Sequence, residues 1–281
     1  MQKSILMLLL LGFSLSSSLG QNSYENEWKE VESLVRKGLP QSALKIVDSI
    51  YLQAKTGNNA PQFLKAALYQ IKLRSDYQED FMESSLEQIG QELENSNSPA
   101  RQILYSVQAE LYWRYYQGNR YKFMERTRIS NPDPKEIKTW DLQTMVNAVS
   151  QNYLASINDA EQLKKIKLDE FDPILQTEKG SKIYRPTLYD FLAHRALEYF
   201  MNEEPAVIKP AAGFYLDQEV FFAPAADFAA YELNPAGKDD LKWQALSVFQ
   251  ELIRFHLNDK DPAALIDVDL LRIKFADQYS V

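Results

Sequence analysis

Apolar residues recur every three or four positions along most of this chain, which is the period of an α-helix with one buried face. In 24–38, for example, Trp28, Val31, Leu34 and Val35 fall on one stripe. Alternating runs of β-branched residues are scarce. The pattern predicts an all-α protein, with helices at 24–38, 39–57, from Pro61 onward, and at 80–95, 99–117, 139–157, 187–202, 238–257 and 262–278.

Residue types that favour helix ends support these limits. Gly38 follows an apolar stripe, where a glycine can take the left-handed conformation that ends a helix, and the next stripe ends at Gly57. Ser98 precedes a proline and is expected to cap the helix over 99–117. Asp133, in the stretch NPDPKE, is expected to cap a further helix start.

The first helices pair into hairpins. Trp28, Phe63 and Ile103 occupy similar places in three successive first helices, at spacings of 35 and 40 residues. That range is typical of tetratricopeptide-type repeats. The stretch 38–50 resembles the second half of such a repeat, with Ala43 where a small residue lets two helices approach. We therefore expect tetratricopeptide-like hairpins stacked as a solenoid.

The regular pattern weakens further along the chain. Residues 203–237 are rich in proline, alanine and aromatic residues and lack a clean period. Irregular segments of that length often pack on a surface or carry function. We expect helical hairpins over 21–118, a continuation of the helical domain over 119–281, and a chain cut through a longer solenoid at Val281.

The first twenty residues have the features of a signal peptide. Lys3 precedes an apolar run from Ile5 to Leu11, and Ser18-Leu19-Gly20 provides small residues for cleavage before Gln21. The apolar run is shorter than the roughly 20 residues that a spanning helix needs. We therefore expect export, with no membrane insertion after signal cleavage. The location expected is the periplasm or outer cell surface of a Gram-negative-type envelope.

The charge and the cysteine content of the chain limit the kinds of partner and cofactor that it can bind. The chain has 39 acidic and 31 basic residues, and loss of Lys3 with the signal segment leaves 30 basic residues and a net charge of −9. Nucleic acid and anionic membranes favour the opposite sign. With no cysteine, the chain forms neither a disulfide scaffold nor a cysteine-rich zinc site. We expect a protein partner and no cofactor.

The stretch 185–200 carries one of two histidines, His194, with Asp190 four residues before it and Glu198 four after. This column suggests either a catalytic or metal site or an ordinary helix surface. Thr187 and Asp190 have the spacing of a capping box, which gives the aspartate a structural task. The other histidine, His256, is remote in sequence. We favour a capped helix with His194 and Glu198 on its wetter side.

Two stretches mix aromatic residues with features of a protein interface. The first, 112–128, is expected to bury Tyr112, Trp113 and Tyr116, while its basic residues pair with acidic neighbours or contact a partner. The second, 213–233, is expected to fold over the helices as a lid, with a binding groove as the alternative. The candidate protein-contact residues are Arg114, Arg120, Lys122, Arg126, Arg128, Phe221 and Phe222.

Sequence motifs of common enzyme classes are missing. The chain has no glycine-rich phosphate loop, no Gly-x-Ser-x-Gly, no His-Glu-x-x-His and no cysteine nucleophile. Carboxylate pairs have no sequence signature, so a hydrolase stays an alternative. We expect a non-catalytic protein with no catalytic, cofactor or metal residues.

Several stretches resemble one family, the large bacterial alpha-2-macroglobulin-like proteins, in their N-terminal helical region. They are 24–51, 111–123, 139–146 and above all 185-RPTLYDFLAHRALEYFMNEE-204. In that family a helical region precedes β-sandwich macroglobulin domains, some members carry a Cys–Gln thioester, and the proteins are regarded as envelope protease traps. This chain has no cysteine and no run of β-sandwich strands.

The resemblance implies a non-catalytic scaffold or docking region at the N terminus of an exported protease-inhibitor protein. The partner would be the protein's own C-terminal macroglobulin domains or an envelope protein. A stand-alone helical-repeat binding module of the envelope is the first alternative, and an envelope hydrolase is the second.

Overall fold

The computed structural model describes residues 16–124, 133, 136–204 and 214–280. Most of the predicted signal segment, residues 1–15, lies outside the described residues, as do the candidate contact residues Arg126 and Arg128.

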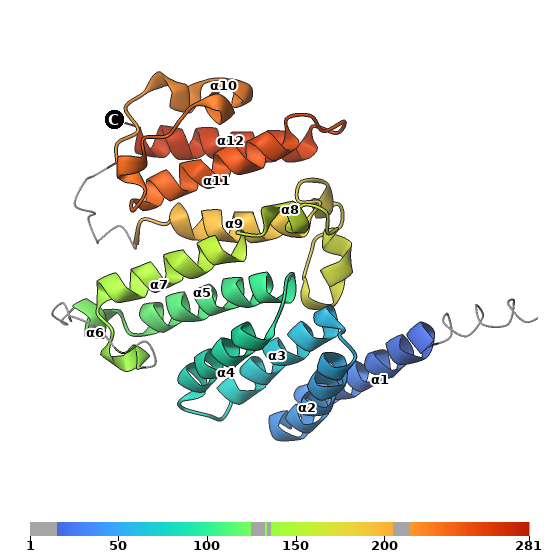
Figure 1. Cartoon of the computed structure of the whole chain (residues 1–281). Helices are drawn as coiled ribbons and strands as arrows, with labels where there is room; N and C mark the ends of the chain where they lie inside the picture. Colours follow the sequence, from blue (N-terminus) through green and yellow to red (C-terminus); the bar gives the residue numbers. More distant parts are fainter. Residues whose placement is uncertain (1–15, 125–132, 134–135, 205–213, 281) are drawn as a thin grey trace, which may run out of the picture. The chain divides into compact units, whose positions relative to one another are not determined.

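The described residues form helices and contain no β-strand, which confirms the all-α prediction (Figure 1). The α-helices are α1 Ser16–Arg36, α2 Pro40–Thr56, α3 Ala60–Ser75, α4 Phe81–Asn95, α5 Ala100–Gly118, α6 Arg120–Met124, α7 Leu142–Ser156, α8 Ala160–Leu163, α9 Leu188–Phe200, α10 Ala225–Ala230, α11 Leu241–His256 and α12 Ala263–Tyr279. Short 3₁₀ helices are η1 Ile137–Thr139, η2 Leu168–Ile174, η3 Ser181–Ile183, η5 Glu219–Phe222 and η6 Pro235–Gly237. None of the described helices is long and apolar enough to cross a membrane.

The chain forms two compact units, Met1–Ser85 and Leu86–Val281, and the boundary falls inside α4. The pattern of apolar residues predicts helical hairpins over 21–118 and a continuation of the helical domain over 119–281.

In the first unit, α2 packs against both α1 and α3. Its core consists of Trp28, Val31, Ala43, Val47, Ile50, Ala66 and Leu73. The Trp28 indole donates to Gln62 Oε1 at 2.6 Å, which joins α1 to α3. The ammonium group of Lys65 lies 4.2 Å from the centre of the same indole ring. Apolar burial therefore holds the three helices together, with few polar links.

Two turns end the first two helices in the same way. Gly38 has φ +71°, and the amide of Leu39 donates to the carbonyl of Leu34 at 3.0 Å, which is a Schellman motif. At the end of α2 the left-handed residue is Asn58 (φ +52°), whereas Gly57 has φ −81°. The prediction that this helix ends at Gly57 is confirmed, because Gly57 is the C-cap of α2. Asparagine fills the left-handed position because it tolerates the left-handed region better than most residues.

In the second unit, successive helices pack on one another: α5 on α7, α7 on α9, α9 on α11, and α11 on α12 (Figure 1). The start of α7 differs from expectation, because Asp141 caps it through the amide of Thr144 at 2.8 Å. The expected start around Asp133 falls largely outside the described residues. The expected Ser98 cap is wrong as well, since Pro99 occupies the N-cap position of α5 without a side-chain hydrogen bond.

The segment after α9 is irregular, as predicted, and its described part packs on α11 and α12. Phe228 is fully buried, and Gln250 of α11 donates to the carbonyls of Phe228 and Tyr231 at 2.8 and 2.7 Å. Tyr215 stays exposed. This arrangement fits a lid over the helices better than an open aromatic groove.

One fully buried arginine fixes the lid to α12. The Arg272 guanidinium donates to the carbonyls of Phe221 and Ala223 at 2.7 and 2.9 Å and to Asp269 at 2.8 Å. Its central carbon lies 4.6 Å from the centre of the Phe228 ring. A charged group is thus buried with a carboxylate, two carbonyl acceptors and an aromatic face.

Candidate functional site

A capping box begins α9, as the sequence predicts. The Thr187 hydroxyl accepts from the amide of Asp190 at 3.3 Å, and the Asp190 carboxylate accepts from the amide of Thr187 at 2.9 Å. The Thr187 hydroxyl also donates to the same carboxylate at 2.7 Å. One oxygen of Asp190 is therefore fully occupied by the helix start.

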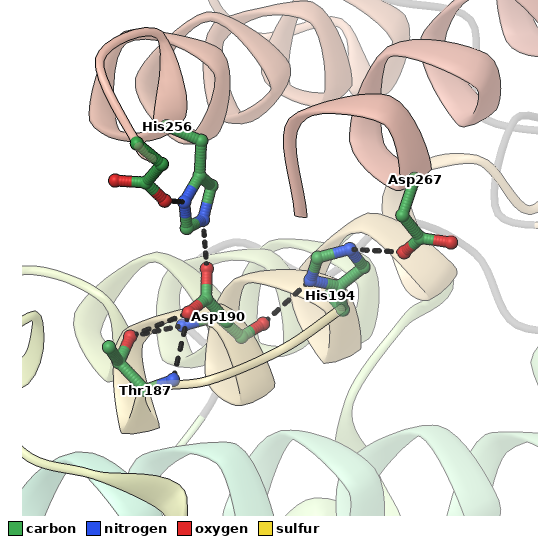
Figure 2. Close-up of polar contacts among 6 residues, drawn as sticks. Thr187, Asp190, His194, His256 and Asp267 are labelled. Atoms are coloured by element: carbon green, nitrogen blue, oxygen red, sulfur yellow. Dashed lines mark hydrogen bonds and ion pairs between the residues drawn. The ribbon is translucent and has the colours of Figure 1, made fainter. Parts of the chain in front are cut away.

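The other oxygen of Asp190 meets the second histidine. His256, the last residue of α11, directs Nε2 to Asp190 Oδ1 at 2.7 Å and Nδ1 to Asp259 at 2.7 Å (Figure 2). The side chains of His256 and Asp190 are both buried. Sequence reasoning missed this contact, because the two residues lie 66 positions apart and no short motif connects them.

The other histidine, His194, is buried as well. Its Nδ1 lies 2.7 Å from the carbonyl oxygen of Asp190, one turn earlier in α9. Its Nε2 has no hydrogen-bond partner and lies 3.7 Å from a carboxylate oxygen of Asp267 in α12 (Figure 2). We call the set Thr187, Asp190, His194, His256, Asp259 and Asp267 the histidine junction.

The prediction that His194 lies on the wetter side of its helix is wrong. The residue is 6 % exposed. The reason is that α9 packs against α5, α7, α8 and α11, so most of its circumference is covered. Glu198, one turn further on, is exposed and lines a different surface. The structure thus separates the Asp190–His194–Glu198 column instead of joining it into one site.

The surroundings of the two histidines shift their pKa values in opposite directions. Burial by itself lowers the pKa of His256, but its hydrogen bonds with Asp190 and Asp259 and their negative charges outweigh burial and raise the pKa. Burial and the positive charge of Arg185 lower the pKa of His194, against smaller opposing effects of Asp190 and Asp267. His256 is therefore the histidine that carries a proton more readily.

A small polar cleft lies on the other side of α9. It has a volume of about 230 Å³ and is lined by Glu110, Trp113, Gln117, Tyr153, Arg195, Glu198, Tyr199 and Asn202. Glu110 accepts from Arg114 at 2.6 Å and from the Tyr153 hydroxyl at 3.2 Å, and Arg195 Nε donates to Ser106 at 2.8 Å. Burial and the Glu110 charge raise the pKa of the Tyr153 hydroxyl. The charged groups of the cleft thus link α5, α7 and α9.

The basic candidate contact residues that the structure describes are exposed, and each has a partner on the chain. Arg114 pairs with Glu110 and Arg120 pairs with Glu204. The ammonium group of Lys122 donates to Asn119 at 2.9 Å. The prediction that the arginines pair with acidic neighbours is confirmed for these two. Their exposure leaves them accessible to a partner as well.

The two aromatic candidate contact residues differ in how much of each side chain is exposed. Phe221 is a residue of the lid and is 2 % exposed, so it offers no surface to a partner in this conformation. Phe222 is 45 % exposed. In the strip over 112–116, Trp113 and Tyr116 are buried as predicted, while Tyr112 is half-buried beside Trp140 with ring centres 5.1 Å apart.

Among the described residues, no group of three or more His, Asp or Glu side chains is arranged to hold a metal ion. No protein-family model matches the chain, and no curated protein and no solved structure matches it.

Proposed function

We propose that this chain is a non-catalytic helical scaffold or docking region at the N terminus of an exported alpha-2-macroglobulin-like, protease-trapping protein. One observation carries the proposal. The stretch 185–204, on which the family resemblance rests most strongly, forms α9 and uses its buried polar groups to join helices. Thr187 and Asp190 build the helix start, Asp190 holds α11 through His256, and Arg195 reaches α5 through Ser106.

The first unit supports the finer proposal of tetratricopeptide-like hairpins. Ala43 is fully buried in α2, as expected of a small residue at a close helix approach. The bond between Trp28 and Gln62 joins α1 to α3 across 34 positions. A tetratricopeptide repeat has that length.

The surface best suited to a protein partner in the second unit is the outer face of α12. Ile266, Leu270 and Ile273 lie at helical spacing and are 52, 55 and 37 % exposed. Residues three and four apart in a helix share a face, so they form one apolar stripe. We propose that the protein's own macroglobulin domains cover this stripe. Arg114, Arg120, Lys122 and Phe222 form a second, more polar contact candidate.

Two measurements, made one after the other, test the proposal. The first is to read the gene beyond the codon for Val281: β-sandwich domains encoded there support the macroglobulin proposal. A stop codon within a few tens of residues contradicts it and favours the stand-alone binding module.

The second measurement is calorimetric titration of this chain with those domains. We expect Ile266→Ser with Leu270→Ser to weaken binding at least tenfold. Leu52→Ser, at an exposed position of the first unit, is the matched control and should bind as the unmodified chain does. Equal affinity for all three proteins would show that α12 is not the docking face.

Export is tested separately. Amino-terminal sequencing of the protein from an envelope fraction should find Gln21 as the first residue. An intact Met1 in the cytosolic fraction contradicts export to the periplasm or cell surface.

A further inference from the structure

The histidine junction contains two imidazoles that need different protonation states. Both nitrogens of His256 lie 2.7 Å from carboxylate oxygens. A carboxylate only accepts, so both nitrogens must donate, and the ring is the imidazolium form. Nδ1 of His194 faces a backbone carbonyl, which also only accepts. The hydrogen of a neutral His194 ring is therefore on Nδ1.

This assignment leaves His194 Nε2 as a buried lone pair without a donor. An oxygen of Asp267, which is another acceptor, lies 3.7 Å from this nitrogen. Two acceptors cannot bond to each other, so the contact is open while the ring is neutral. A proton on Nε2 would convert it into a donor directed at a carboxylate. Such charge-assisted bonds measure about 2.7–2.9 Å, so closure requires an approach of roughly 1 Å.

Asp267 is placed to make that approach. It belongs to α12, and its side chain is 36 % exposed, whereas His194 is enclosed. The exposed apolar residue Ile266 precedes it in the sequence, and Leu270 lies one turn later. If α12 itself makes this approach, the apolar stripe that it carries moves with it.

The charged groups around His194 do not supply a competing partner for Nε2. On the side of α9 itself and of α11, Asp190 is engaged by His256 and the capping box. The loop before α9 contributes Arg185, which repels a proton on the ring. From α8, the ammonium group of Lys164 lies over the rings of Tyr189 and Phe255.

On the side of α5 and α7, Glu110 is engaged by Arg114 and Tyr153, and Arg195 donates to Ser106. Asp267 is therefore the carboxylate that a protonated Nε2 would meet.

We propose that His194 and Asp267 form a proton-triggered latch between α9 and α12. The latch is open when the ring is neutral, and it closes when acidification places a solvent proton on Nε2, which then donates to Asp267. His256 holds α11 on α9 in both states, because its proton is already in place. The device couples the position of the α12 stripe to pH, and it stands independently of the proposed macroglobulin context.

Nitrogen-15 NMR of the two imidazoles tests the latch, and a chain with only two histidines gives simple spectra. At pH 7.5 we expect His194 as the Nδ1–H tautomer and, on acidification, a titration below that of His256. Asp267→Asn removes the charged acceptor and should lower the pKa of His194 further, with that of His256 unchanged. The matched control Asp259→Asn should lower the pKa of His256 alone, and Asp267→Glu should largely restore the titration of His194.

Amide hydrogen exchange distinguishes a latch from a local electrostatic effect. After correction for intrinsic rates, acidification should slow exchange over 263–270 relative to the rest of α12, and this protection should be lost in Asp267→Asn. An Nε2–H tautomer at pH 7.5, a His194 titration unchanged by Asp267→Asn, or equal exchange in both proteins would each overturn the proposal.

Discussion

The first unit and the histidine junction both hold helices together, but with different chemistry. In the first unit, α1, α2 and α3 meet through Trp28, Val47, Ile50 and other apolar side chains. In the second unit, the fully buried Asp190 joins α9 to α11 through His256, and the fully buried Arg272 joins α12 to the lid. Apolar packing tolerates a range of substitutions of similar volume, whereas a buried charge requires its particular partner. The two regions should therefore respond differently to mutation and pH.

The largest effect is expected from Arg272→Ala. This change removes a buried cation and leaves Asp269 and two lid carbonyls without their donor. Breaking a buried charged cluster by removing one partner typically costs about 3–5 kcal/mol. The free energy of unfolding, measured from the denaturant dependence of amide exchange in peptides of the second unit, should fall by that amount. Protection of α2 peptides is the internal control. An unchanged second unit would mean that Arg272 does not anchor the lid.

His256→Leu should have the next largest effect, about 3 kcal/mol on the second unit. The substitution leaves the Asp190 carboxylate buried with only its capping-box donors. Asp259→Asn is the comparison variant, because Asp259 is 41 % exposed and its pair with His256 is partly solvated. We expect it to cost less than about 1 kcal/mol. Equal losses in the two variants would contradict the view that Asp190 is the partner that matters.

In the first unit, Ala43→Leu should cost about 2 kcal/mol, because a larger side chain has no room at a fully buried position between helices. Leu52→Ser, at a position 63 % exposed, should change stability by less than about 0.5 kcal/mol. Urea unfolding followed by exchange in α2 and α3 peptides measures both. If Ala43→Leu is tolerated, the close approach expected of a tetratricopeptide-like hairpin is absent.

The pH dependence of stability should separate the two units. The raised pKa of His256 contributes stability that is present below the pKa of the unfolded chain, near 6.5, and is lost as pH rises through the folded value. The lowered pKa of His194 has the opposite sign: its contribution is present above about 6.5 and is lost as pH falls through the folded value. Thermal unfolding followed by exchange should give a maximum near pH 6.5 for the second unit and a flatter profile for the first. A maximum that persists in both His194→Asn and His256→Leu would assign it to other groups.

The smallest effect concerns the turn after α2. Asn58→Ala should cost about 1 kcal/mol, because alanine is disfavoured at φ +52°. Asn58→Gly should be neutral or slightly stabilising. Amide hydrogen exchange in α2 peptides measures the stability of both variants. Equal stability of the two variants would show that the turn does not require a left-handed residue at this position.

The helices themselves follow from local sequence. The three- and four-residue spacing predicted α2, α5, α9, α11 and α12 to within a few residues, since a buried stripe and a helix end are properties of neighbouring positions. The capping box of Thr187 and Asp190 was predictable for the same reason. The end of α2 at Gly57 was predictable as well, whereas the left-handed position of Asn58 was not part of the prediction.

The histidine junction was not predictable from the sequence. His194 belongs to a helix whose periodicity suggested a wetter side there, and only the packing of other helices around α9 buries it. The contact between Asp190 and His256 joins residues 66 positions apart, and Arg272 meets the carbonyl of Phe221 across 51. Such contacts depend on how helices stack, which is a non-local property. Local sequence is therefore enough to locate the helices and most of their ends. Which polar groups become buried partners depends on tertiary packing, because burial and pairing of a charge require elements that are distant in the chain.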